Sequence, residues 1–108
     1  MNKVLNTLGI CACARKICYG ETLLKEIKNK KVYCVVVASD ASDNSKKKII
    51  DKCTYYKCDY VVCLDKESIT KSIGRVDLVS AVGIKDSNLV KKLKENIERE
   101  GGSSEEKQ

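Results

Sequence analysis

The sequence predicts an α/β fold, a three-layer α/β/α sandwich with a central sheet of about four strands. Short apolar segments alternate with segments whose apolar residues recur every three or four positions, which is the pattern of alternating strands and amphipathic helices. The segment VYCVVVAS, residues 32–39, is almost continuously apolar and β-branched, as is typical of a strand covered on both faces. Helices on both sides of a buried sheet follow from these two patterns.

The first half of the chain predicts helix, strand, helix and strand. Apolar residues at helical spacing indicate an amphipathic helix over residues 2–14. Residues 16–19 form a short strand that Gly20 ends, and three apolar residues then mark a helix over about 21–29. The β-branched segment 32–39 is the next strand.

The second half continues the alternation. SDASDNS, residues 39–45, is rich in residues that cap helix N-termini, and it opens a third helix. One face of that helix is formed by Ile49, Ile50, Cys53 and Tyr56. A buried strand, a short helix stopped by Gly74, an apolar strand and a final helix follow over residues 60–64, 66–74, 78–84 and about 87–100.

Length and composition indicate one domain with a polar tail. A chain of 108 residues fits one compact domain, which we expect over residues 1–100. The tail GGSSEEKQ, residues 101–108, contains no apolar residue and is expected to be disordered. No segment approaches the roughly 18 apolar residues of a transmembrane helix, so we expect no membrane-spanning segment.

The chain is basic. Its formal net charge is +6, and leaving out residues 101–108 leaves 20 basic and 13 acidic residues, a charge of +7. Excess positive charge on a small domain favours a polyanionic partner, with nucleic acid first and an anionic membrane surface second. A generally lysine-rich surface without any such partner is the alternative.

Cysteine is abundant and histidine is absent. The seven cysteines include Cys34 and Cys63, which lie inside apolar segments, and this pattern suits packing in a reducing cytosol. Without histidine the commonest general base is missing, and neither GxxxxGK[ST] nor GxGxxG occurs. Cys18, near Arg15 and Lys16, is the one candidate nucleophile, with a buried structural thiol as its alternative. We expect no catalysis and no cofactor.

The cysteine spacing does not favour a metal site. Cys11, Cys13 and Cys18 form C-x-C-x4-C, and a second C-x4-C ends at Cys58. Positions two apart on a helix point about 200° apart, so Cys11 and Cys13 do not face one ion.

The segment RKICYGETLLKEI, residues 15–27, is the first candidate binding site. Gly20 allows a sharp turn, and helix N-terminal amides after it attract anions. Glu21 is an acceptor for base amines, Thr22 bonds either way, and Lys25 lies one turn further on. A simple capped helix with a Glu21–Lys25 ion pair is the alternative.

A second candidate is the lysine run at residues 46–48. Three cations in the first turn of a helix oppose its macrodipole, which suggests phosphate contact, with a solvated lysine face as the alternative. Aromatic residues are too few for a base-stacking platform. We therefore predict core-edge packing for Tyr55, Tyr56 and Tyr60.

Several of these segments resemble one known family. The phrases LGICACARKICYGETLLKEI, VVVASDASDNSKKKIIDKCTYYKC, ITKSIG and VSAVGIKDSNLVKKL are similar to the kink-turn-binding ribosomal protein superfamily, in its bacterial YlxQ-type branch. The similarity covers about residues 5–95, and the ITKSIG segment matches the superfamily pattern LGxAxG with Ile69 in place of Leu. The fold that this resemblance implies is also an α/β/α sandwich.

The resemblance implies binding to kink-turns, sharply bent internal loops of RNA that contain tandem G·A pairs. In the family a corner of pattern G-x-N-E-x-x-K meets these pairs, and a loop after LGxAxG packs on flipped-out bases. The corner of this chain is one residue shorter and carries Glu21-Thr22, of which the carboxylate only accepts hydrogen bonds. Carried over with the neighbouring cations, the RNA-binding residues are Arg15, Lys16, Gly20, Glu21, Thr22, Lys25, Lys28, Asp40 (beside the corner), Lys46, Lys47, Arg75, Val76, Asp77 and Leu78.

The sequence thus predicts a cytoplasmic, monomeric, non-catalytic protein that binds kink-turn-like RNA, with a link to the ribosome or translation. The alternative is a protein-interaction module on the same fold with little affinity for RNA, because the superfamily also contains members that bind proteins.

Overall fold

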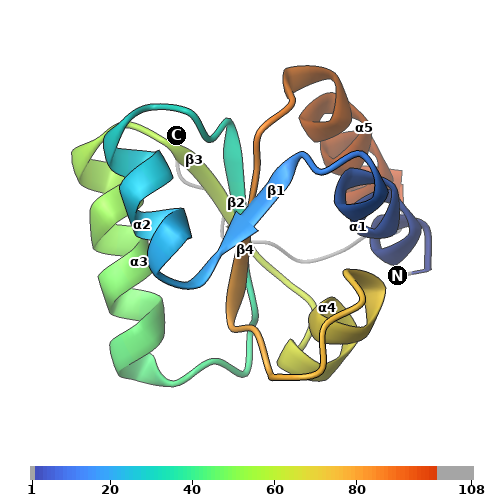
Figure 1. Ribbon diagram of the computed structural model, residues 1–108, viewed down its shortest axis with the longest axis horizontal. Helices are drawn as coiled ribbons and strands as arrows, with labels where there is room; N and C mark the ends of the chain where they lie inside the picture. The colour runs from blue at the N-terminus through green and yellow to red at the C-terminus, as the bar shows by residue number, and fades with distance from the viewer. Residues whose placement is uncertain (1, 100–108) are drawn as a thin grey trace.

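The computed structural model describes residues 2–99, which form five helices around a four-stranded sheet (Figure 1). The helices are α1 (Asn2–Cys13), α2 (Gly20–Lys28), α3 (Asp43–Tyr55), α4 (Lys66–Ser72) and α5 (Ser87–Arg99). The strands are β1 (Ile17–Tyr19), β2 (Cys34–Val37), β3 (Asp59–Val62) and β4 (Ala81–Ile84). The predicted disordered tail, 101–108, lies outside the described residues.

The sheet is mixed, with the strand order β1-β4-β2-β3. Strand β4 is antiparallel to both β1 and β2, whereas β2 and β3 run parallel. Figure 1 shows α2 and α3 on one face of the sheet and α1, α4 and α5 on the other. The predicted three-layer α/β/α sandwich is therefore confirmed.

Two hydrophobic cores lie on the two faces of the sheet. Along β2, Cys34 and Val36 pack into the core under α1, α4 and α5, while Val35 and Val37 pack into the core under α2 and α3. All four side chains are buried, since successive side chains of a strand point to opposite faces. This confirms the inference that the β-branched segment is covered on both sides.

The two longest predicted strands are shorter in the structure. The predicted strand 32–39 is β2, residues 34–37, and the predicted strand 78–84 is β4, residues 81–84. Residue Leu78 lies outside the sheet and is exposed, whereas the next residue, Val79, is buried and donates its amide hydrogen bond to Thr70 Oγ1 at 2.8 Å. Apolar residues of this segment, such as Leu78 and Val79, therefore need not belong to the strand.

The prediction for the tyrosines is only partly right. Tyr60 is buried in β3 and Tyr56 packs partly buried against the core under α2 and α3. Tyr55 is not at the core edge: its side chain is 78% exposed. It occupies the last position of α3, one helical position from Tyr56, which turns it away from the sheet.

None of the helices within residues 2–99 is long and apolar enough to cross a membrane.

Candidate nucleic-acid interface

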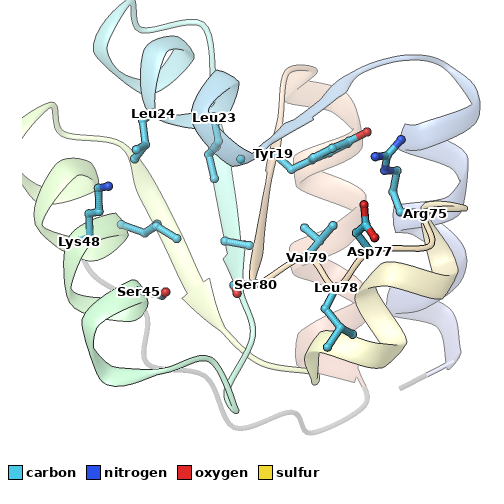
Figure 2. A pocket seen from close by; sticks show the side chains of 13 residues that line it. Tyr19, Leu23, Leu24, Ser45, Lys48, Arg75, Asp77, Leu78, Val79 and Ser80 are labelled. Atoms are coloured by element: carbon cyan, nitrogen blue, oxygen red, sulfur yellow. The ribbon is translucent and has the colours of Figure 1, made fainter.

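A cavity of about 370 Å³ opens at one end of the sheet. The strand register brings together the end of β1, the start of β4 and the end of β2, because Tyr19 pairs with Val82 and Val37 pairs with Ala81. Helices α2 and α3 both begin at this end. We call the hollow between their first turns and the α4–β4 loop (residues 73–80) the sheet-end cavity (Figure 2).

The first wall of the cavity is the corner between β1 and α2. Gly20 has φ +67°, in the left-handed region that glycine adopts without strain, so the chain turns directly from strand into helix. The N-cap residue Tyr19 makes no side-chain capping bond, whereas Ser42 and Asp65 cap α3 and α4. Within residues 2–99 the N-cap side chain thus leaves the first-turn amides of α2 uncapped, at a helix end that attracts anions.

The corner does not form the ion pair that the sequence left open. Glu21, Thr22 and Lys25 are all exposed, and none of the three lines the cavity itself, although they adjoin Gly20, which does. Among the described residues no ion pair joins Glu21 to Lys25. The carboxylate of Glu21, the hydroxyl of Thr22 and the ammonium of Lys25 are thus available to a ligand.

The second wall is the α4–β4 loop. The Arg75 guanidinium lies 5.2 Å from the centre of the Tyr19 ring, which joins this loop to the corner (Figure 2). Val76 and Leu78 are 95% and 63% exposed, and Asp77 stands between them. Large apolar side chains exposed beside cations are a common feature of binding surfaces.

The backbone of this loop is held at both ends by one buried residue. Thr70 accepts a hydrogen bond from the Arg75 amide with its carbonyl at 3.0 Å and from the Val79 amide with its hydroxyl at 2.8 Å. Gly74, at φ +74°, allows the chain to leave α4 between them. The exposed side chains of the loop thus stand on a fixed backbone.

The third wall is the first turns of α3, and it contains three residues outside the carried-over set of RNA-binding residues. Ser45, Lys48 and Ile49 line the cavity, because positions three and four apart share a helix face. Lys46 and Lys47 point to other faces of α3 and do not line it. The lysine run 46–48, already a candidate for phosphate contact, was the available signal for Lys48.

Of the predicted residues, Gly20, Arg75, Asp77 and Leu78 line the cavity, and Arg15, Lys16 and Lys28 lie away from the corner as well. Arg15 and Lys16 precede β1, and the strand separates them from Gly20, so they stand at the opposite end of the sheet. Lys28 is in the last turn of α2, two turns beyond the corner. Sequence neighbours on either side of a strand reach different ends of a sheet, so the basic pair does not belong to this corner.

Asp40 has a structural partner. It follows β2 at the same end of the sheet as the corner, but it does not line the cavity. Its carboxylate accepts a hydrogen bond from the Lys66 amide at 2.9 Å, at the start of α4. Asp40 therefore joins the β2–α3 loop to α4.

Five of the seven thiols are buried in the cores, whereas Cys13 is exposed and Cys58 is partly buried. Burial raises the pKa of Cys18 to about 11 and does the same for Cys11 and Cys63. At neutral pH these thiols are protonated, and the thiolate is the nucleophilic form. Within residues 2–99 no three His, Cys, Asp or Glu side chains are placed to hold a metal ion.

The sequence is similar to that of known proteins over nearly all of its length. Residues 2–94 match the model of the ribosomal protein L7Ae/L30e/S12e/Gadd45 family. The chain belongs to that family. "RNA-binding protein YlxQ" of Enterococcus faecium is 40% identical over 97 residues, covering 89% of this chain and 92% of the relative. The protein of the same name from Bacillus subtilis (strain 168) is 39% identical over 87 residues, covering 80% and 86%.

Two solved structures have the same fold. A protein of unknown function from Bacillus halodurans superposes with a TM-score of 0.82 and 34% identity, over 89% of this chain and 97% of that one. The Giardia lamblia 15.5kD RNA binding protein superposes with a TM-score of 0.71 and 19% identity, over 90% and 83%. At that identity the second likeness supports the fold alone.

Proposed function

We propose that the protein binds structured RNA of the kink-turn type at the sheet-end cavity and catalyses no reaction. The observation that carries this proposal is the meeting of an uncapped helix N-terminus with a fixed loop that exposes Val76 and Leu78. The first suits phosphates and base edges, and the second suits unstacked bases. Membership of a family with ribosomal members, and relatives named RNA-binding proteins, supports a role in the translation apparatus.

The residues of the corner divide into two roles. The Glu21 carboxylate accepts hydrogen bonds from exocyclic amines of bases, and the Thr22 hydroxyl donates or accepts. Lys25, exposed one turn beyond Glu21, neutralises a phosphate. Because a carboxylate repels phosphates, Glu21 favours base edges that hold the backbone of the RNA away from it.

The loop and α3 complete the surface. Val76 and Leu78 pack against flipped-out bases, while Arg75, held over Tyr19, and Lys48, on the opposite wall, contact phosphates on the two sides of the cavity.

The proposal is tested by titrating the protein with a kink-turn RNA and with a straight duplex of matched length. We expect at least about tenfold tighter binding of the kink-turn, with affinity that falls steeply as salt increases. Equal, weak affinity for the two RNAs contradicts the proposal.

Two alanine variants, one of a lysine and one of an arginine, locate the RNA-binding site. Lys25→Ala is expected to weaken kink-turn binding by about tenfold, because it removes a charge-assisted phosphate contact. Arg15→Ala removes an equal charge from the opposite end of the sheet and serves as the matched control, with little expected effect. A larger loss from Arg15→Ala than from Lys25→Ala places the RNA elsewhere.

A second candidate function is protein binding on the same surface. Val76, almost fully exposed, and the carboxylates of Glu21 and Asp77 are also suited to a basic, apolar protein partner. Recovery of a stoichiometric protein partner from cells, combined with no crosslinked RNA, favours this function over RNA binding.

A further inference from the structure

The sheet-end cavity continues along the outer face of α3. Lys48 lines the cavity and also lines an open groove of about 490 Å³, which Asp51, Lys52, Tyr55 and Tyr56 complete. The two hollows therefore meet at Lys48, which Figure 2 shows on the α3 wall of the cavity.

Tyr55 supplies an aromatic surface at the far end of this groove. Its side chain is 78% exposed, and its ring meets Tyr56 edge to face, with ring centroids 4.8 Å apart and planes at 81°. Tyr56 is anchored against the core, so Tyr55 rests on a fixed neighbour while most of its own ring surface faces water. Exposed rings of this kind are stacking sites for unpaired bases.

Two cations lie between the cavity and this ring. Lys48, Lys52 and Tyr55 stand at spacings of four and three residues, and so form one stripe along the helix. Among the described residues neither lysine forms an ion pair, and Asp51 is the one carboxylate that lines the groove. The stripe is net positive, which complements a phosphate backbone.

The length of the stripe sets the size of the ligand. Seven helical residues separate Lys48 from Tyr55, which corresponds to about 10 Å. Stacked nucleotides of one strand are spaced by about 3.4 Å, so the groove accommodates about three nucleotides.

We propose that this α3 groove binds a single-stranded extension of the RNA whose structured part occupies the sheet-end cavity. Lys48 and Lys52 bind consecutive phosphates, and Tyr55 stacks on a base about three nucleotides beyond the structured part. The inference rests on the proposed function and adds a second contact region to it.

The test compares one kink-turn RNA with and without three single-stranded adenosines, added in separate molecules at each strand end. We expect one extended RNA to bind about tenfold tighter than the unextended RNA. Tyr55→Ala should abolish this gain and leave the unextended affinity unchanged, whereas Tyr55→Phe, which keeps the ring, should retain it. Lys52→Gln should reduce the salt slope for the extended RNA by about 0.7.

Matched controls lie on the other face of the sheet. Ile10 is an exposed apolar residue of α1, and Lys92 is an exposed cation of α5. Ile10→Ala and Lys92→Gln should leave both affinities unchanged.

Four results overturn the inference. An extension that adds no affinity at either end, or a gain that survives Tyr55→Ala, rejects the α3 groove while kink-turn binding itself stands. A gain lost equally in Ile10→Ala places the extension elsewhere on the molecule. Failure of both RNAs to bind better than a straight duplex removes the proposed function, and the inference with it.

Discussion

Gly20 turns the chain through a backbone conformation that most residues avoid. A Cβ atom at this position would meet nothing within 4 Å, so the obstacle to substitution is backbone strain and not a clash. We expect Gly20→Val to displace the start of α2, to cost about 1–2 kcal/mol of stability and to weaken RNA binding. Gly20→Asn, which tolerates the left-handed conformation, should retain both properties. Equal binding by Gly20→Val in a fluorescence titration would show that the corner geometry is unimportant.

Gly83 is the opposite case, because its conformation is ordinary and its surroundings are crowded. A Cβ atom here would lie 2.5 Å from Leu23 Cδ1, 3.0 Å from Val32 Cγ1 and 3.2 Å from Cys18 Sγ. This close packing seats α2 on β4. We predict that Gly83→Ala lowers the free energy of unfolding by about 1–3 kcal/mol.

A double variant, Gly83→Ala with Leu23→Ala, identifies the cause of that loss of stability. Leu23→Ala removes the atom that the new methyl group would strike, so the combined substitutions should cost less than the sum of the two single ones in urea denaturation. Strict additivity would mean that overpacking against Leu23 is not the reason.

The Glu26–Lys85 ion pair makes stability depend on pH. The Lys85 ammonium donates a hydrogen bond to the Glu26 carboxylate at 2.6 Å, and this bond lowers the pKa of that carboxyl group. A group whose folded pKa lies below its unfolded value, about 4.3 for Glu, stabilises the protein above that value and loses the effect as the pH falls through the folded pKa. Glu26→Gln should therefore be less stable than the parent at pH 7, and the difference should shrink by pH 3 in thermal melts.

At the scale of elements, the α4–β4 loop depends on Thr70. This buried residue accepts a hydrogen bond from the Arg75 amide with its carbonyl and one from the Val79 amide with its hydroxyl. Thr70→Val keeps the shape of the side chain but leaves the buried Val79 amide without its acceptor, at a cost of about 1–3 kcal/mol. We expect lower stability together with faster hydrogen exchange in residues 75–79.

The matched control for that variant is Thr54→Val, since Thr54 is an exposed helical threonine of α3. It should change the free energy of unfolding by no more than about 0.5 kcal/mol and leave hydrogen exchange in residues 75–79 unchanged. If Thr70→Val leaves the exchange rates of the loop unchanged, then Thr70 does not position it.

The elements themselves could largely be predicted from local pattern. Helical spacing predicted every helix, and short apolar segments such as 32–39 predicted every strand, because both signals lie within a few residues. The strand that includes Leu78 and Val79 was predicted too long. Whether an apolar residue packs inward like Val79 or stands exposed like Leu78 depends on Thr70, which belongs to another element.

At the scale of the whole molecule, local pattern could not predict how the strands are ordered. The central position of β4 between β1 and β2 depends on pairings far apart in sequence. The same order decides which residues share the sheet-end cavity. It brings Arg75 to Tyr19 and Lys48 to the corner, and it separates Arg15 from Gly20 by the length of β1.

A two-dimensional NMR titration of the protein with a kink-turn RNA tests most directly whether RNA binds at the sheet-end cavity. We expect the largest amide shift changes in the first turns of α2 and α3 and in the α4–β4 loop, with small changes in α1 and α5. Shift changes concentrated in helices α1 and α4, or no changes at saturating RNA, would show that RNA does not bind at the sheet-end cavity.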